Sequence, residues 1–149
     1  MDFTGFSLPQ ILSLAGSLSS IVADISEVVV INMITAQIES RIPVKGAKGL
    51  NDITADNRGT VFVSDSELGN VIRIYHGKVS VYLSDLPGAN GLKAIGKDLY
   101  NLTDGHLYKS SPGNRKAVPI SAMIRFIISC LCHPFLKKSV IAYRLQNTQ

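Results

Sequence analysis

The chain has 149 residues, of which 46% are hydrophobic and 17% charged. This length suits one domain, and the hydrophobic content excludes disorder over the whole chain. The net charge of +4 is unevenly placed, because residues 105–149 carry seven Lys or Arg and no acid. These basic residues are scattered and come with no recognition motif, so we expect no nucleic-acid partner.

The first 23 residues allow two interpretations. The apolar run Ile11–Leu18 has the length of a secretory signal, but Asp2 precedes it and the first basic residue is Arg41. A signal needs a positive start, so the charge argues against one. The alternative is that Gly16–Asp24 is a β-strand of a repeated unit. Localisation therefore stays open, with the cytoplasm favoured.

A hairpin at residues 51–64 is the unit that the rest of the chain repeats. Asn51–Ala55 predicts a first strand, Asp56–Gly59 a turn and Thr60–Ser64 a second strand. Asp, Asn and Gly tolerate the backbone angles of a hairpin turn, and the second strand alternates with period two. Further short segments predict strands in the same rhythm: 16–24, 27–32, 38–44, 71–75, 79–83, 90–94, 98–103 and 105–109.

Polar residues recur at fixed intervals along these strands. Asn51 and Asn90 are 39 residues apart, and Asp24, Asp65 and Asp104 follow at spacings of 41 and 39. Four short strands in about 40 residues is the period of a β-propeller blade. A β-sandwich of hairpins is the alternative, but it gives no reason for this recurrence.

The sequence thus predicts an all-β fold, a fragment of a β-propeller with four-stranded blades over residues 1–116. The repeats are expected at about 5–42, 43–83 and 84–116, and they amount to about two and a half blades. Residues 117–149 then form a basic, apolar tail unrelated to the repeat. Since incomplete blades leave open strand edges, we expect self-association through those edges.

The segments Gly49–Ile53, Val63–Asp65 and Pro87–Leu92 resemble the family of senescence marker protein, gluconolactonase and luciferin-regenerating enzyme. The resemblance implies a six-bladed propeller with a divalent cation, calcium or zinc, at one end of its channel. It also implies hydrolysis of sugar lactones. By motif position, Asn90 is the expected metal ligand and Asn51 the expected contact to substrate or water.

The chain departs from that family at two ligands. A Glu in the first blade has no counterpart here, and the family's later Asp falls where this sequence has Ser121–Ile124. We therefore expect a truncated gluconolactonase-like protein that is inactive alone. Two alternatives stay open: a metal-dependent lactonase completed by oligomerisation, and a non-catalytic propeller module that binds a partner.

Simpler roles compete with each candidate residue. Asn51 and Asn90 also suit turn caps, and Asp65 and Asp104 suit strand ends where a carboxylate binds backbone amides. The cluster Cys130, Cys132 and His133 lacks the spacing of a zinc site, so buried apolar cysteines are the expectation.

The apolar segment Ala117–Leu136 predicts a helix that covers an exposed sheet edge. Its 20 residues are long enough to span a bilayer, but Arg125 lies well inside it. Membrane insertion is therefore the less favoured interpretation.

Overall fold

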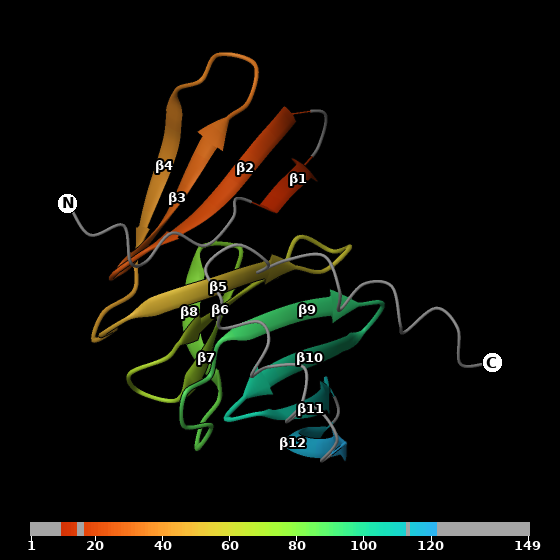
Figure 1. The fold of residues 1–149 in the computed structure, drawn as a ribbon. Helices are drawn as coiled ribbons and strands as arrows, with labels where there is room; N and C mark the ends of the chain where they lie inside the picture. The colour runs from red at the N-terminus through yellow and green to blue at the C-terminus, as the bar shows by residue number, and fades with distance from the viewer. Residues whose placement is uncertain (1–9, 15–16, 113, 122–149) are drawn as a thin grey trace, which may run out of the picture.

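The computed structural model describes residues 10–14, 17–112 and 114–121. These residues are all-β, and twelve strands form three antiparallel sheets of four strands (Figure 1). Each sheet uses four consecutive strands, so we call them blade 1 (β1–β4), blade 2 (β5–β8) and blade 3 (β9–β12). The predicted all-β fold with four-stranded blades is confirmed.

The strands have the following bounds. Blade 1 consists of β1 (Gln10–Leu14), β2 (Ser17–Asp24), β3 (Glu27–Asn32) and β4 (Ile38–Pro43). Blade 2 consists of β5 (Leu50–Ala55), β6 (Val61–Asp65), β7 (Asn70–Tyr75) and β8 (Lys78–Leu83). Blade 3 consists of β9 (Gly91–Ile95), β10 (Asp98–Thr103), β11 (His106–Ser111) and β12 (Asn114–Ser121).

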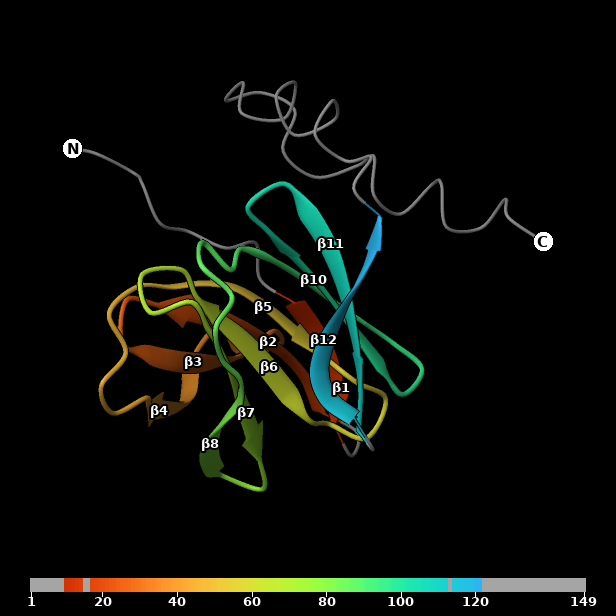
Figure 2. The ribbon, with the colours of Figure 1, turned by 90° about the horizontal axis from the view of Figure 1, so that it is seen from below.

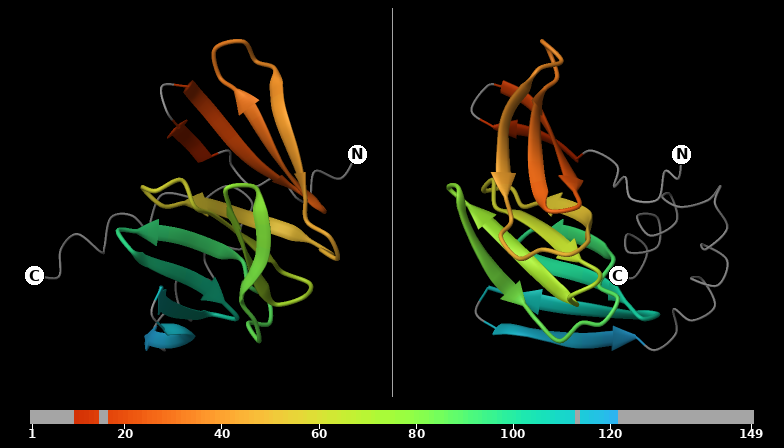
Figure 3. Two further views of the ribbon diagram at one scale, coloured as in Figure 1. Left: turned by 180° about the vertical axis from the view of Figure 1, so that it is seen from behind. Right: turned by 90° about the vertical axis from the view of Figure 1, so that its left-hand side faces the viewer.

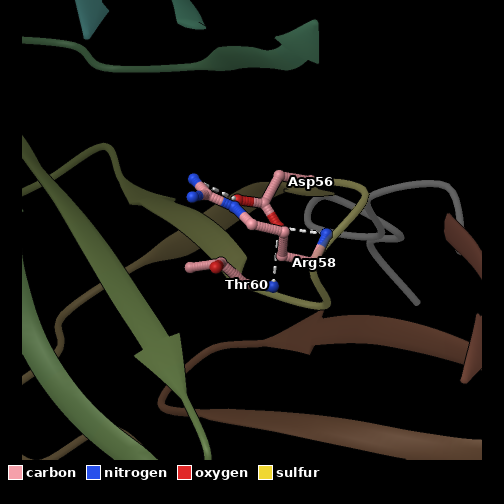
Figure 4. Close-up of polar contacts among 3 residues, drawn as sticks. All are labelled: Asp56, Arg58 and Thr60. Carbon is pink, nitrogen blue, oxygen red and sulfur yellow. Dashed lines mark hydrogen bonds and ion pairs between the residues drawn. The ribbon is translucent and has the colours of Figure 1, made fainter. Parts of the chain in front are cut away.

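The turn between β5 and β6 is fixed by one side chain. Oδ1 of Asp56 accepts hydrogen bonds from the backbone N–H groups of Arg58 and Thr60, both at 2.9 Å (Figure 4). Gly59 has a φ of +76°, a conformation that a side chain would disfavour, and its N–H donates to the Asp56 carbonyl at 3.1 Å. The hairpin predicted at residues 51–64 is therefore confirmed, together with the reason for its turn.

The three blades are arranged side by side in chain order, with blade 2 between its two neighbours (Figures 1 and 3). Figure 2 shows the same arrangement from below. The first strand of each sheet is its inner strand, and β5 lies beside both β9 and β2. Since blade 2 is covered on both flanks, every residue of β6 is buried.

Two apolar clusters join the blades. We call the packing of blade 1 on blade 2 the 1–2 junction and that of blade 2 on blade 3 the 2–3 junction. The buried members of the 1–2 junction are Ile21, Ala23, Val28, Val44, Leu50, Ile53, Val61, Val63, Ile72 and Ile74. Those of the 2–3 junction are Phe62, Val71, Leu83, Leu86, Ala89, Leu92 and Leu99. Successive residues of β6 alternate between the two clusters, as the pleat requires.

The third blade extends further than the sequence pattern indicated. β12 runs to Ser121, and its Val118 pairs with Lys109 of β11. The structure thus has three four-stranded sheets, where we expected about two and a half blades ending at residue 116. Residues 117–121 belong to this strand, while the remainder of the segment predicted as a helix lies outside the described residues. Within the part of the chain that is described, no helix is long and apolar enough to cross a membrane.

Candidate functional site at the inner strands

The two predicted site residues lie at the start of neighbouring inner strands. Asn51 is the second residue of β5 and is half-buried, whereas Asn90 directly precedes β9 and is exposed. Because β5 and β9 lie side by side, the structure places both positions on the inner side of blades 2 and 3. Neither side chain makes a hydrogen bond with another described residue.

The backbone around Asn90 is held firmly by blade 2 and by its own blade. Its N–H donates to the carbonyl of Leu102 at 3.0 Å, and its carbonyl accepts from the Ser64 hydroxyl at 2.8 Å. The same hydroxyl accepts from the N–H of Asp52 at 2.9 Å. Ser64 is fully buried and therefore links the beginning of β5 to the beginning of β9.

Asp52 is a carboxylate near these two asparagines that the sequence analysis did not single out. Its Oδ2 accepts a hydrogen bond from the N–H of Leu92 at 2.7 Å, and the hydroxyl of Thr54 accepts one from the N–H of Ala94 at 3.3 Å. Residues two apart on a strand share a face, so Asp52 and Thr54 both face blade 3. The sequence signal that could have identified Asp52 is therefore the Asp52-Ile53-Thr54 alternation of polar and apolar residues in the first strand of the hairpin.

The strand-ending acids differ in what they do. Asp65 is fully buried, and its carboxylate accepts from the N–H groups of Lys48 at 2.8 Å, Gly49 at 3.2 Å and Leu68 at 3.1 Å. Its predicted structural role is confirmed. The Asp24 carboxylate binds the next N–H, of Ile25, at 2.8 Å.

Asp104 does not repeat the role of Asp65, although their spacing suggested it. It is exposed in the turn between β10 and β11 with a φ of +42°. The residue before it, Thr103, is the buried one at this strand end, and its hydroxyl donates to the carbonyl of Pro87. At this strand end, blade 3 thus has a buried hydroxyl where blade 2 has a buried carboxylate, and the acid of blade 3 lies in the turn.

The donors near Asn51 and Asn90 do not fit the implied cation. Calcium takes six to eight oxygen ligands with several carboxylates among them, and zinc takes about four. Here two neutral amide oxygens have one carboxylate nearby, that of Asp52, and it is bonded to a backbone N–H. Among the described residues, no three His, Cys, Asp or Glu side chains gather in a metal-binding group. The cluster Cys130, Cys132 and His133 lies outside those residues.

Comparison of the sequence with family models and with curated proteins gives no match. Comparison of the structure with solved structures gives clear ones. Virginiamycin B lyase from Staphylococcus aureus aligns with a TM-score of 0.64 at 15% identity, over 78% of this chain and 41% of that chain. A chain of a nidogen/laminin complex aligns with a TM-score of 0.63 at 12% identity, over 78% of this chain and 47% of that chain.

A computationally designed protein, Ika4, is also similar. Its TM-score is 0.53 at 14% identity, and the alignment covers 75% of this chain and 71% of the designed one. The chain spans less than half the length of the lyase and of the nidogen/laminin chain. At these identities the likeness shows the fold alone. The described residues are therefore three blades of a β-propeller.

Proposed function

We propose that the chain is a gluconolactonase-like propeller segment that does not hydrolyse lactones on its own. The single observation that carries this proposal is the hydrogen bond from the Leu92 N–H to the Asp52 carboxylate, at 2.7 Å. The carboxylate next to Asn51 in the sequence thus serves the joint between two blades. A lactonase of the implied type needs a cation to polarise the ester carbonyl or its own water, and the donors here are too few and too neutral to hold one.

The other polar side chains of the inner strands support the same conclusion. Thr54 and Ser64 are both buried and bind backbone groups of β9 or of the residue before it. Polar atoms that satisfy buried backbone groups stabilise the fold, and their removal leaves unpaired donors or acceptors. The inner face of blades 2 and 3 therefore acts as a joint, and the segment acts as a non-catalytic propeller module.

A metal-dependent lactonase completed by a further set of blades is the second candidate. The observation that favours it is the state of the Asn51 and Asn90 side chains, which bond to no other described residue. In a ring closed by additional blades, these amide oxygens would supply two of the ligands. The carboxylates would then have to come from the blades opposite.

Hydrolysis of glucono-1,5-lactone by the full chain tests the proposal, with calcium or zinc added at millimolar concentration. We expect no rate above buffer and no rise in melting temperature, because a ligand stabilises a protein only when it binds the folded state. Metal-dependent hydrolysis that Asn90→Ala abolishes would contradict the proposal and favour the second candidate.

The role of Asp52 is tested separately by thermal unfolding. We expect Asp52→Ala to lower the free energy of unfolding by about 1–3 kcal/mol, since the Leu92 N–H loses its acceptor. Asp52→Asn retains a side-chain oxygen and is expected to recover part of that loss. Equal stability of the wild type and Asp52→Ala would show that this carboxylate does not hold the blades together.

A further inference from the structure

Blade 1 and blade 3 each have one flank that packs against no other described blade. On blade 3 this flank faces away from blade 2, and the cross-strand pairs of β10 and β11 define it. Tyr100 pairs with Lys109, and Leu102 pairs with Leu107. On blade 1 the corresponding flank contains the pairs Val22–Val29 and Ser20–Ile31 of β2 and β3. Val22 and Ile31 are half-buried, whereas Val29 and Ser20 are already buried in a single copy.

These two flanks match the two surfaces that meet at each internal junction. On blade 2, the pairs Phe62–Arg73 and Ser64–Val71 face blade 3. They occupy the same register as the outward pairs of blade 3. In both blades the first pair joins an aromatic to a basic residue, while the second pair is Ser64–Val71 in blade 2 and Leu102–Leu107 in blade 3. The free flank of blade 3 is thus built like a surface that receives a following blade.

The free flank of blade 1 matches the opposite surface. On blade 2, the pairs Val63–Ile72 and Val61–Ile74 face blade 1 and are buried in the 1–2 junction. The equivalent positions in blade 1 are the pairs Val22–Val29 and Ser20–Ile31. They precede Asp24 along β2 in the same way as the blade 2 pairs precede Asp65 along β6. Three of these four residues are aliphatic, so this flank is built like a surface that receives a preceding blade.

The net charge of blade 1 also differs in sign from that of blade 3. Residues 10–43 carry Asp24, Glu27 and Glu39 against Arg41, a net charge of −2. Residues 91–121 carry five Lys or Arg against Asp98 and Asp104, a net charge of +3. Lys93 and Lys109 flank Tyr100 on neighbouring strands of the free flank of blade 3, where Lys109 forms an ion pair with Asp98. Opposite charges favour the approach of blade 3 to blade 1 over the approach of either blade to its own copy.

Exposed apolar residues extend both flanks at their outer strands. Val118 of β12, which pairs with Lys109, is 50% exposed, and Ile38 of β4, which pairs with Ile31, is 51% exposed.

We propose that the occupant of both flanks is a second copy of this chain, with blade 3 of each copy packed against blade 1 of the other. Two such contacts related by a two-fold axis close a ring of six blades. The contact is head to tail, and closure at two copies prevents the open filament that an unclosed head-to-tail contact would give. This inference does not depend on whether the ring hydrolyses a lactone.

Sedimentation equilibrium of the full chain tests the proposal. One copy has a mass of 16.1 kDa, so we expect a single species of about 32 kDa at micromolar concentration. A monomer at 100 µM would overturn the proposal and would show that another occupant covers the flanks. A ladder of larger species would overturn the closed ring.

A matched pair of variants locates the contact. Val118→Glu places a charge on the free flank of blade 3, and Val81→Glu places the same charge on β8 of blade 2, where the valine is 56% exposed. We expect Val118→Glu to raise the dimer dissociation constant at least tenfold and Val81→Glu to leave it unchanged. Because both valines are half exposed, both variants are expected to fold, which circular dichroism checks. Equal weakening by the two variants, or an unchanged constant for Val118→Glu, would contradict the proposed contact.

Discussion

The 1–2 junction and the 2–3 junction join equivalent surfaces by different means. At the 1–2 junction the pairs Ala23–Val28 of blade 1 and Val63–Ile72 of blade 2 are aliphatic on both sides. At the 2–3 junction hydroxyl and carboxylate groups of blade 2 bind the backbone of blade 3. Ser66 donates to the Ala89 carbonyl at 2.6 Å, and Asp52 accepts from the Leu92 N–H at 2.7 Å.

The contrast is sharpest at one position. Val63 and Asn101 both pair with the inner strand, with Ile53 and Leu92 respectively, and both are almost completely buried. Neither amide atom of Asn101 has a hydrogen-bond partner among the described residues. A buried polar group without a partner reduces stability. The same blade architecture thus accommodates a joint built around an aliphatic cluster and a polar joint with an unsatisfied amide.

The largest loss of stability is expected when the asparagine of blade 3 is placed at the equivalent position of the 1–2 junction. Val63→Asn removes aliphatic packing and buries an amide among Ile53, Ile72 and their neighbours. We expect a loss of about 3–5 kcal/mol in the free energy of unfolding, measured by urea denaturation. Val81→Asn, at an exposed position of the same blade, serves as the control and should change stability by less than about 0.5 kcal/mol. Similar losses for the two variants would show that the 1–2 junction is not a tightly packed joint.

The reverse exchange is expected to have a smaller effect of the opposite sign. Asn101→Val removes the unsatisfied amide and gives blade 3 the residue that blade 2 has. We expect stability to rise by about 1–3 kcal/mol in the same urea experiment. A destabilised variant would mean that the amide of Asn101 has a partner in the intact protein.

The smallest change in stability is expected at the free flank of blade 3, where Asp98 forms an ion pair with Lys109 at 2.7 Å. Hydrogen bonds from Lys109 and then Ser111 hold the pKa of Asp98 below its ordinary value of 3.8. A carboxyl with a lowered native pKa stabilises the fold above its unfolded pKa. That contribution is lost as the pH falls through the native value.

Melting temperatures of the wild type and Asp98→Asn between pH 7 and pH 2 check this expectation. We expect the wild type to be the more stable protein at neutral pH and the difference to shrink below pH 3.8. Because the pair is at the surface, the difference is small even at its maximum. A difference that stays constant with pH would rule out the ionised carboxylate as its cause.

Most of the strands could be predicted from the sequence, because their signals are local. The bounds of β3 and β10 agree with the predicted segments, and Asp56 and Gly59 identify the turn of the first hairpin. β12 was not predicted, since the repeat pattern ends near residue 114 and the apolar composition from Ala117 onward also suits a helix. Its pairing with β11 makes it a strand, and pairing is a tertiary property.

The candidate site was less predictable than the fold. The positions of Asn51 and Asn90 on neighbouring inner strands follow from the 39-residue repeat. The bond between Asp52 and Leu92 joins residues 40 apart in different blades, and no periodic pattern encodes which donor a carboxylate meets. The same limit applies to Asn101. The alternation of side chains along β10 places it inside the 2–3 junction, but whether its amide finds a hydrogen-bond partner depends on the residues of blade 2 that face it.

The chain-order pairing of the strands has a consequence for folding. Among the described residues every hydrogen-bonded strand pair joins consecutive strands, so the strand pairing within each blade is local in sequence. Local contacts form fast, and repeat units couple mainly to their nearest neighbours. We therefore expect blades to form in the order of synthesis on the ribosome, with β5–β8 completed before β9 is available. The polar 2–3 junction would then be the last described joint to close, and hydrogen exchange at the Leu92 and Ala94 amides should report its opening.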